Sequence, residues 1–95
     1  LNATSICHFD DMVTRFCVRM QVADQPGVLA QIAAVFGKHG ISLESVLQKS
    51  SDDRSAEIFW MTHRCPQRAM NASLQDFDGM STVNEVSSVL RVEGE

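Results

Sequence analysis

The chain repeats a strand-helix-strand pattern, and this repeat is the strongest constraint on its fold. Residues 15–22 alternate strictly between apolar and polar positions, as does a later segment over 56–63, and each is followed by apolar residues at helical spacing. The two helical stripes superpose on a shift of 41 positions, from 28 to 69. They pair Val28, Leu29, Ile32, Ala33 and Phe36 with Ala69, Met70, Ser73, Leu74 and Phe77. The sequence therefore predicts βαβ twice.

The borders of the predicted elements follow from breaks in the two periods. Helices are predicted from Pro26 to Lys38 and from Pro66 to about Gly79, because proline is tolerated in a first helical turn. Gly40 suits a left-handed stop after the first helix. Strands are predicted over 15–22, 41–47, 56–63 and 86–92, separated by loops that include the polar run 50–55. The second strand places Ile41, Leu43 and Leu47 in one row with Ser45, which is typical of an edge strand.

Right-handed crossovers place both predicted helices on one face of a four-stranded antiparallel sheet. This is the ferredoxin-like α+β sandwich, with the first and third strands in the middle. The third strand carries Ile58 and Trp60 on one side and Phe59 and Met61 on the other. One of these pairs must lie on the face without helices, in a strip extended by Cys17 or Val89, so we expect that face to be a contact surface.

Length and charge restrict the class of protein. A chain of 95 residues has room for one core. Eight basic against twelve acidic side chains give a net charge of −4, which disfavours a nucleic-acid partner, and no apolar run is long enough to cross a membrane. Three cysteines without close metal spacing favour a reducing compartment, so we expect a cytoplasmic protein. Because the negative net charge disfavours nucleic acid, we expect Trp60 and its aromatic neighbours to pack in a core or an interface rather than to stack on nucleic-acid bases.

Residues 1–13 show no sustained period and are predicted to be a linker or the end of an upstream domain, which leaves 14–95 as the folded unit. The absence of an initial Met predicts a fragment of a longer chain. Cys7, His8, Asp10 and Asp11 are metal-ligand types, but without a second ligand pair a solvated linker is favoured over a metal site. His39 and His63 lack a positioned acid or nucleophile, so no catalytic residue is predicted.

The loop Val-Ala-Asp-Gln-Pro-Gly-Val-Leu, over 22–29, is the segment most indicative of function. Free N–H groups at the start of the following helix favour a carboxylate, and Asp24 beside them can accept an ammonium. Gly27 leaves room for a ligand or a neighbouring backbone to approach. Together these groups fit an α-amino acid zwitterion. The alternative interpretation is that Asp24 only caps the helix.

The order of these residues resembles the ACT domain family, small βαββαβ modules that bind amino acids and regulate enzymes. The resemblance rests on Asp-x-Pro-Gly-Val-Leu after an alternating strand and on a helix closing in Gly-Ile-Ser-Leu, and it runs from about Arg15 to Val92. It implies an effector site between two side-by-side domains. The residues implied are Asp24, Gln25, Pro26, Gly27 and Val28 of one chain with Ile41 and Ser42 of another. Many amino-acid-binding members have Asn where this chain has Asp24 and Ser42.

The segments Val-Leu-Gln-Lys, Met-Thr-His and the terminal Val-Leu-Arg-Val-Glu-Gly are similar to the C-terminal ACT domains of bacterial homoserine dehydrogenases. This similarity implies a regulatory domain that senses threonine or a related amino acid for feedback control of threonine and methionine biosynthesis. It implies a homodimer through the ACT domains and a parent enzyme using NADP or NAD, with no cofactor and no metal in the domain itself. The alternatives are a structural dimerisation module without effector binding, or the ACT domain of another enzyme of amino-acid metabolism. An acylphosphatase-like hydrolase is disfavoured, because Asp24 stands where its phosphate-binding loop needs Arg.

Overall fold

A computed structural model describes residues 12–50 and 54–92 of the chain. Its elements, in chain order, are β1 (Val13–Ala23), α1 (Val28–Lys38), β2 (Leu43–Ser50), β3 (Ser55–Thr62), β4 (Cys65–Pro66), α2 (Gln67–Asp78) and β5 (Val83–Val92). The first eleven residues of the predicted linker lie outside the described residues, and Val13 already belongs to β1.

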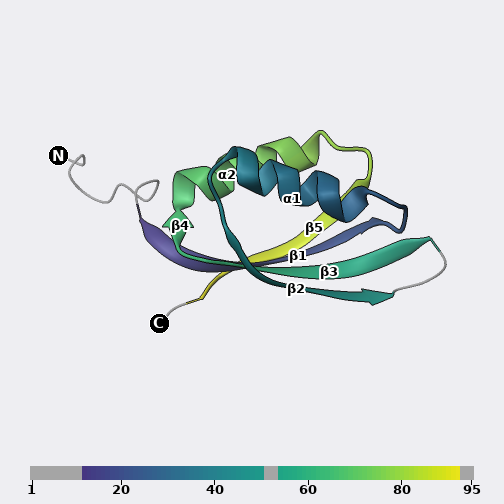
Figure 1. Cartoon of the computed structure of the whole chain (residues 1–95), viewed down its shortest axis with the longest axis horizontal. Helices are drawn as coiled ribbons and strands as arrows, with labels where there is room; N and C mark the ends of the chain where they lie inside the picture. The colour runs from purple at the N-terminus through teal and green to yellow at the C-terminus, as the bar shows by residue number, and fades with distance from the viewer. Residues whose placement is uncertain (1–11, 51–53, 93–95) are drawn as a thin grey trace.

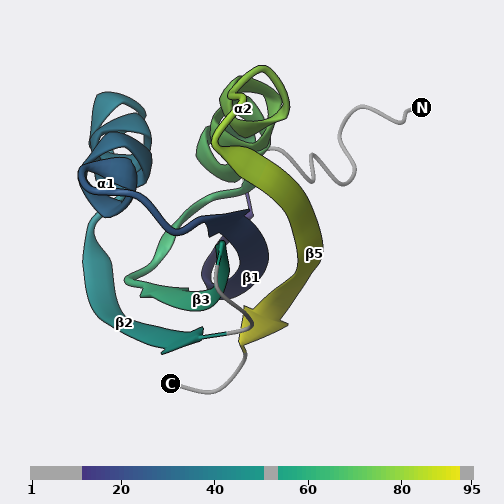
Figure 2. The same cartoon turned by 90° about the vertical axis from the view of Figure 1, so that its right-hand side faces the viewer.

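The sheet has β1 at its centre, paired antiparallel with β3 on one side and with β5 on the other. β2 pairs antiparallel with β3, so the long strands run in the order β2-β3-β1-β5, and the short β4 pairs with the start of β1. Both helices lie on the same side of this sheet (Figures 1 and 2). The predicted α+β ferredoxin-like arrangement is confirmed, with the predicted first and third strands in the middle.

The alternation in the two central strands separates a core face from an uncovered face. In β1 the residues Phe16, Val18, Met20 and Val22 are at most 1% exposed, as predicted. In β3 the buried residues are Ala56, Ile58, Trp60 and Thr62. Phe59 and Met61 therefore lie on the face without helices, which settles the choice that the sequence left open.

Three aromatic rings join the two βαβ halves. The ring of Phe36 in α1 lies 5.5 Å from the ring of Trp60 in β3 and 5.1 Å from the ring of Phe77 in α2, the latter edge to face. All three side chains are at most 1% exposed. Such pairs stabilise a core beyond their buried area, so Phe36 fixes both helices to the sheet at one point.

Several predicted borders shift in the structure. The first helix begins at Val28 and the second at Gln67, so neither Pro26 nor Pro66 is a helical residue. Pro66 instead pairs with Val13 in β4, a strand that the sequence analysis missed because two residues carry no period. The last strand begins three residues earlier than predicted, at Val83, because bulges break its alternation.

The predicted single row of β2 is wrong because the strand contains a bulge. Leu43 pairs with Thr62 and Ser45 with Met61, so Glu44 is the extra residue. The bulge places Leu43 against the core and moves Leu47 to the uncovered face beside Phe59. As predicted, β2 is an edge strand.

The end of α1 is fixed both by backbone geometry and by an ion-pair cluster. Gly40 adopts a φ of 77°, and the N–H of Ile41 donates to the carbonyl of Phe36 at 2.9 Å, as expected of a left-handed helix stop. His39 Nε2 and Lys38 Nζ lie 2.8 Å and 3.3 Å from Asp76 Oδ2 in α2.

Among the residues described, no helix is long and apolar enough to cross a membrane.

We predict that Phe36→Ala lowers the free energy of unfolding by about 3 to 5 kcal/mol, because it leaves a cavity between two rings. Leu29→Ala, on the exposed side of the same helix, is the matched control and should change that free energy by less than about 1 kcal/mol. Urea unfolding of both variants measures the difference. Equal losses would show that the three rings do not anchor the helices.

We predict a loss of stability in acid from the cluster at the end of α1. The hydrogen bond from His39, followed by that from Lys38, holds the pKa of Asp76 below its ordinary value of 3.8. A carboxyl group whose pKa is lowered in the folded state stabilises the fold at pH values above its ordinary pKa. This stabilisation is lost as the pH falls through the pKa of the folded state. Asp76→Asn should therefore reduce the drop in urea midpoint between about pH 6 and about pH 3, while Asp78→Asn should leave it unchanged. An unchanged drop in the Asp76 variant would contradict this.

Candidate functional site

The loop between β1 and α1 is held in place by its own backbone. The N–H of Asp24 donates to the carbonyl of Arg54 at 2.9 Å, and the N–H of Ala23 donates to that of Thr82 at 2.8 Å. These bonds tie the loop to the start of β3 and to the segment before β5. The side chains of Asp24 and Gln25 are therefore free to face solvent while their backbone is fixed.

A cavity of about 210 Å³ lies beside this loop, between the start of α1 and the edge strand β2. Val22, Ala56 and Ile58 contribute core side chains to its lining, and Gln48 contributes from β2. The remaining lining residues are Ala23, Asp24, Gln25, Pro26, Gly27, Val28 and Leu29. The structure thus brings together five of the seven predicted site residues. At about 30 Å³ per water the space equals about seven waters, which suits a small amino acid.

The polar groups around this cavity are unused by the fold. The side chains of Asp24, Gln25 and Gln48 have no hydrogen bond or ion pair within the described part of the chain. Gly27 precedes α1 without a side-chain cap, so the N–H groups of Leu29 and Ala30 also lack partners there. Asp24 does not cap the helix, which removes the alternative role proposed for it. It is the single acidic residue lining the cavity.

Gln48 was missed by the sequence analysis. It lies 24 positions after Asp24, and it reaches the cavity because β2 pairs with β3 in a register that sets Gln48 opposite Ile58. The bulge at Glu44 decides which side of the sheet it faces. No local pattern in the sequence signals that bulge. The signal that could have pointed to Gln48 is its place in Val-Leu-Gln-Lys, one of the segments that carry the resemblance to homoserine dehydrogenases.

Gly27 has a requirement of its own besides the room for a ligand that the sequence predicts. Its φ is 86°, a left-handed backbone conformation that costs other residues about 1 to 2 kcal/mol. A Cβ added to it would meet nothing within 4 Å, so no contact within the chain requires glycine here. The approach of a ligand or of a second copy stays a prediction.

Ile41 and Ser42 do not join the cavity within one chain. They follow the C-terminal end of α1, whereas the loop precedes its N-terminal end, and an 11-residue helix is about 16 Å long. Ile41 is buried and Ser42 is exposed. Only a second copy can bring these two residues to the loop.

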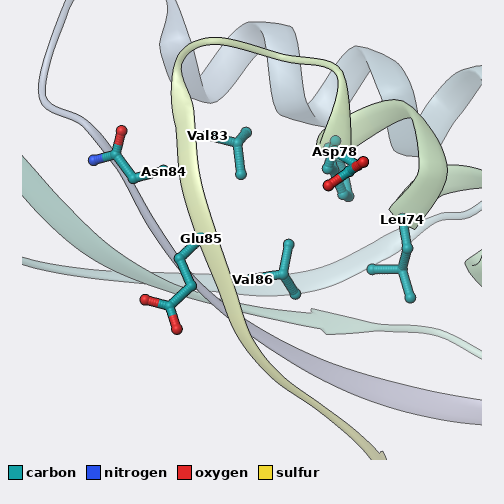
Figure 3. Close-up of a pocket in the computed structure, with 7 residues that line it drawn as sticks. Leu74, Asp78, Val83, Asn84, Glu85 and Val86 are labelled. Atoms are coloured by element: carbon teal, nitrogen blue, oxygen red, sulfur yellow. The ribbon is translucent and has the colours of Figure 1, made fainter.

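A larger cavity of about 430 Å³ lies between α2 and β5. Figure 3 shows Leu74 and Val86 in the space between these elements, while Asn84 and Glu85 project from β5 away from α2. Its polar groups do not converge on one point. The smaller cavity beside Asp24 is therefore the better candidate for a zwitterion.

Other reactive residue types form no site in the described ranges. No group of three or more His, Cys, Asp or Glu there is arranged to hold a metal ion, and the Cys7 to Asp11 cluster lies outside those ranges. Cys65 is buried, and burial raises the pKa of its thiol, an effect that its hydrogen bond with Thr62 partly offsets. A thiol in such surroundings is a poor nucleophile.

The model of the ACT domain family matches residues 18–69, which include the loop, α1, β2 and β3. The chain belongs to the ACT domain family. The match covers the complete wall of the cavity, from Val22 to Ile58. The family model therefore covers the same loop, helix and strands that form the cavity in the structure.

Individual relatives extend the comparison beyond the family model. The chain is 41% identical over 83 residues to a homoserine dehydrogenase of Synechocystis, which covers 87% of this chain and 19% of the relative. A homoserine dehydrogenase structure from Thiobacillus denitrificans matches with a TM-score of 0.80 and 24% identity, over 90% of this chain and 19% of that one. The ACT domain of a Chlorobium tepidum GTP pyrophosphokinase matches with a TM-score of 0.62 and 15% identity, over 85% of this chain and all of that one. The chain thus spans about a fifth of the homoserine dehydrogenases it matches.

We predict opposite effects for alanine at Gly27, which precedes α1, and at Gly37, which lies within it. Gly27→Ala should lower the free energy of unfolding by about 1 to 2 kcal/mol, because alanine is strained at a φ of 86°. Gly37→Ala, inside α1 with open space around it, should raise that free energy by about 0.5 to 1 kcal/mol. Thermal and urea unfolding measure both. A shift of the same sign in both variants would refute the left-handed role of Gly27.

Proposed function

We propose that this ACT domain binds a small α-amino acid in the cavity beside the β1–α1 loop and regulates the enzyme that contains it. The observation that carries the proposal is the placement of an unpaired carboxylate and an uncapped helix start around one small cavity. These two groups match the two charges of a zwitterion. The larger cavity between α2 and β5 does not combine them, because no helix start lines it.

Each charged end of the proposed ligand has a partner of opposite charge. The Asp24 carboxylate accepts hydrogen bonds from the ammonium group, as the only charged side chain lining the cavity. The N–H groups of Leu29 and Ala30 donate to the carboxylate, aided by the positive end of the α1 dipole. Val22, Ala56 and Ile58 form an apolar floor for a short side chain.

Threonine is the ligand that we favour. The Gln48 amide offers both a donor and an acceptor above an apolar floor, which suits a side chain with one hydroxyl and one methyl group. Similarity to homoserine dehydrogenases supports feedback control of threonine and methionine biosynthesis as the purpose. The parent chain is then a cytoplasmic homoserine dehydrogenase, whose NADP or NAD and whose catalytic residues belong to the portion outside this domain.

We further propose that a second copy completes the site. Ile41 and Ser42 lie at the far end of α1 from the loop, so two domains placed side by side can bring the Ser42 hydroxyl of one copy to the loop of the other. The resemblance that nominated these residues implies such a pair. The homodimer is thus part of the proposal for the site.

A second candidate function is structural. A domain that only dimerises needs neither an acidic side chain in the loop nor an amide on β2. The observation in its favour is the replacement of Asn, frequent in amino-acid-binding relatives, by Asp24 and Ser42. The two functions differ in one measurable property, the binding of an amino acid.

We predict that Asp24→Ala weakens threonine binding by about ten- to hundredfold, because a charge-assisted hydrogen bond contributes about 1.5 to 3 kcal/mol. The matched control is Asp78→Ala, an exposed carboxylate at the end of α2 beside the other cavity. Calorimetric titration of the 95-residue chain and both variants measures the affinity, and circular dichroism verifies folding. Gln48→Ala should reduce the preference for threonine over alanine and valine.

The outcome that contradicts sensing is a chain that binds none of the protein amino acids, or whose affinity is unchanged by Asp24→Ala. The first result favours the structural function. In the full-length enzyme, Asp24→Ala should raise the threonine concentration for half inhibition by the same factor and leave turnover without threonine unchanged, because the reaction occurs elsewhere. A lowered thermal midpoint with an unmoved inhibition curve would give Asp24 a structural role only.

A further inference from the structure

A groove of about 510 Å³ lies between the end of α1 and the start of α2. Its lining residues are His39, Gly40, Pro66, Arg68, Ala69 and Ala72. Four of these six are glycine, proline or alanine, so the groove is open because small apolar residues line it. None of the six lines the proposed amino-acid site or the cavity between α2 and β5. The groove is therefore a separate apolar surface that the proposed function leaves unused.

The chain enters the described domain at the edge of this groove. The N–H of Gln67 donates to the carbonyl of Met12 at 2.8 Å. Val13, at the start of β1, pairs with Pro66 of β4, which lines the groove (Figure 1). Met12, the first described residue, is 43% exposed and adds a large apolar side chain at this edge. Because a residue spans at most about 3.6 Å, Phe9 is never more than about 11 Å from Met12 and can reach the groove.

The residues just before Met12 match the groove and its border in chemistry. Residues 8–11 are His-Phe-Asp-Asp, so an aromatic ring is followed by two carboxylates. The border of the groove is basic at this point, because Arg64 and Arg68 lie on either side of β4. Both arginines are exposed, and Arg68 also lines the groove. An aromatic ring can thus lie on the apolar lining while the two acidic side chains face the arginines.

We propose that the groove binds residues 8–11 of the same chain, with the Phe9 ring on Ala69 and Ala72 and the two aspartates beside Arg68. The connection to Met12 supports this occupant over a separate molecule. A segment joined to the edge of a groove by a few residues has an effective concentration in about the millimolar range, so weak contacts are enough to hold it. Docking in this way fixes the direction in which the upstream residues meet the domain.

This inference does not rest on amino-acid binding. The candidate amino-acid site lies at the start of α1 and the groove lies at its end, and an 11-residue helix is about 16 Å long. Threonine binding and the docking of residues 8–11 can therefore be measured separately in the same protein.

The first test measures how fast chymotrypsin cleaves the 95-residue chain after Phe9. Ala72→Glu fills the groove and repels the aspartates, whereas Asn71→Glu puts the same charge on the adjacent exposed residue outside the lining. Cleavage requires that Phe9 leave the groove, so Ala72→Glu should accelerate it at least about tenfold and Asn71→Glu less than about twofold. Mass spectrometry measures the released peptide, and circular dichroism verifies that both variants fold.

The second test leaves the groove unchanged and alters the segment. In the 95-residue chain, Phe9→Ala should shift the backbone amide NMR signals of Ala69 and Ala72, because these groups lose the neighbouring aromatic ring. Ile6→Ala removes another large apolar side chain outside residues 8–11 and should leave both signals unmoved. The amide signal of Gln48, at the candidate amino-acid site, should not move in either variant.

Three results overturn the proposal. Equal cleavage rates in the unaltered chain and in Ala72→Glu show that the groove does not hold Phe9. Equal acceleration by Ala72→Glu and Asn71→Glu assigns the effect to charge alone. Unmoved signals of Ala69 and Ala72 in Phe9→Ala place the ring on another surface. Threonine binding by a chain that gives any of these results would leave the proposed function standing while this inference fails.

Discussion

The packing of Phe36 between Trp60 and Phe77 determines the rest of the architecture. One ring from each helix and one from the central sheet meet at a single point, so both helices must occupy the same side of the sheet. Two consequences follow. The start of α1 stands beside the β2 edge, which creates the small cavity, and the opposite face of the sheet is left without a covering layer. The candidate site and the uncovered face of the sheet are thus two results of one packing arrangement.

The sequence was sufficient where a regular period extends over several turns or residue pairs. The alternation of β1 and the two helical stripes identified buried and partly buried residues, because burial of one face imposes that period directly. The exception is Leu29, which was placed in the first stripe and is 38% exposed. It was insufficient at β2, where the bulge at Glu44 reverses the alternation. A bulge is stabilised by its pairing partner, here β3, and not by a local preference of its own residues. The same reason explains why β4, with two residues, was missed.

The residues of the candidate site likewise include some that the sequence predicts and one that it does not. Asp24 to Val28 are consecutive, so their common position at a helix start was predictable from the order of residue types. Gln48 enters the cavity only through the β2–β3 register, which is a property of the folded sheet. Gly27 was predicted to give room to a ligand, and the structure adds a second reason for glycine, its positive φ, because a sequence alone does not distinguish the two.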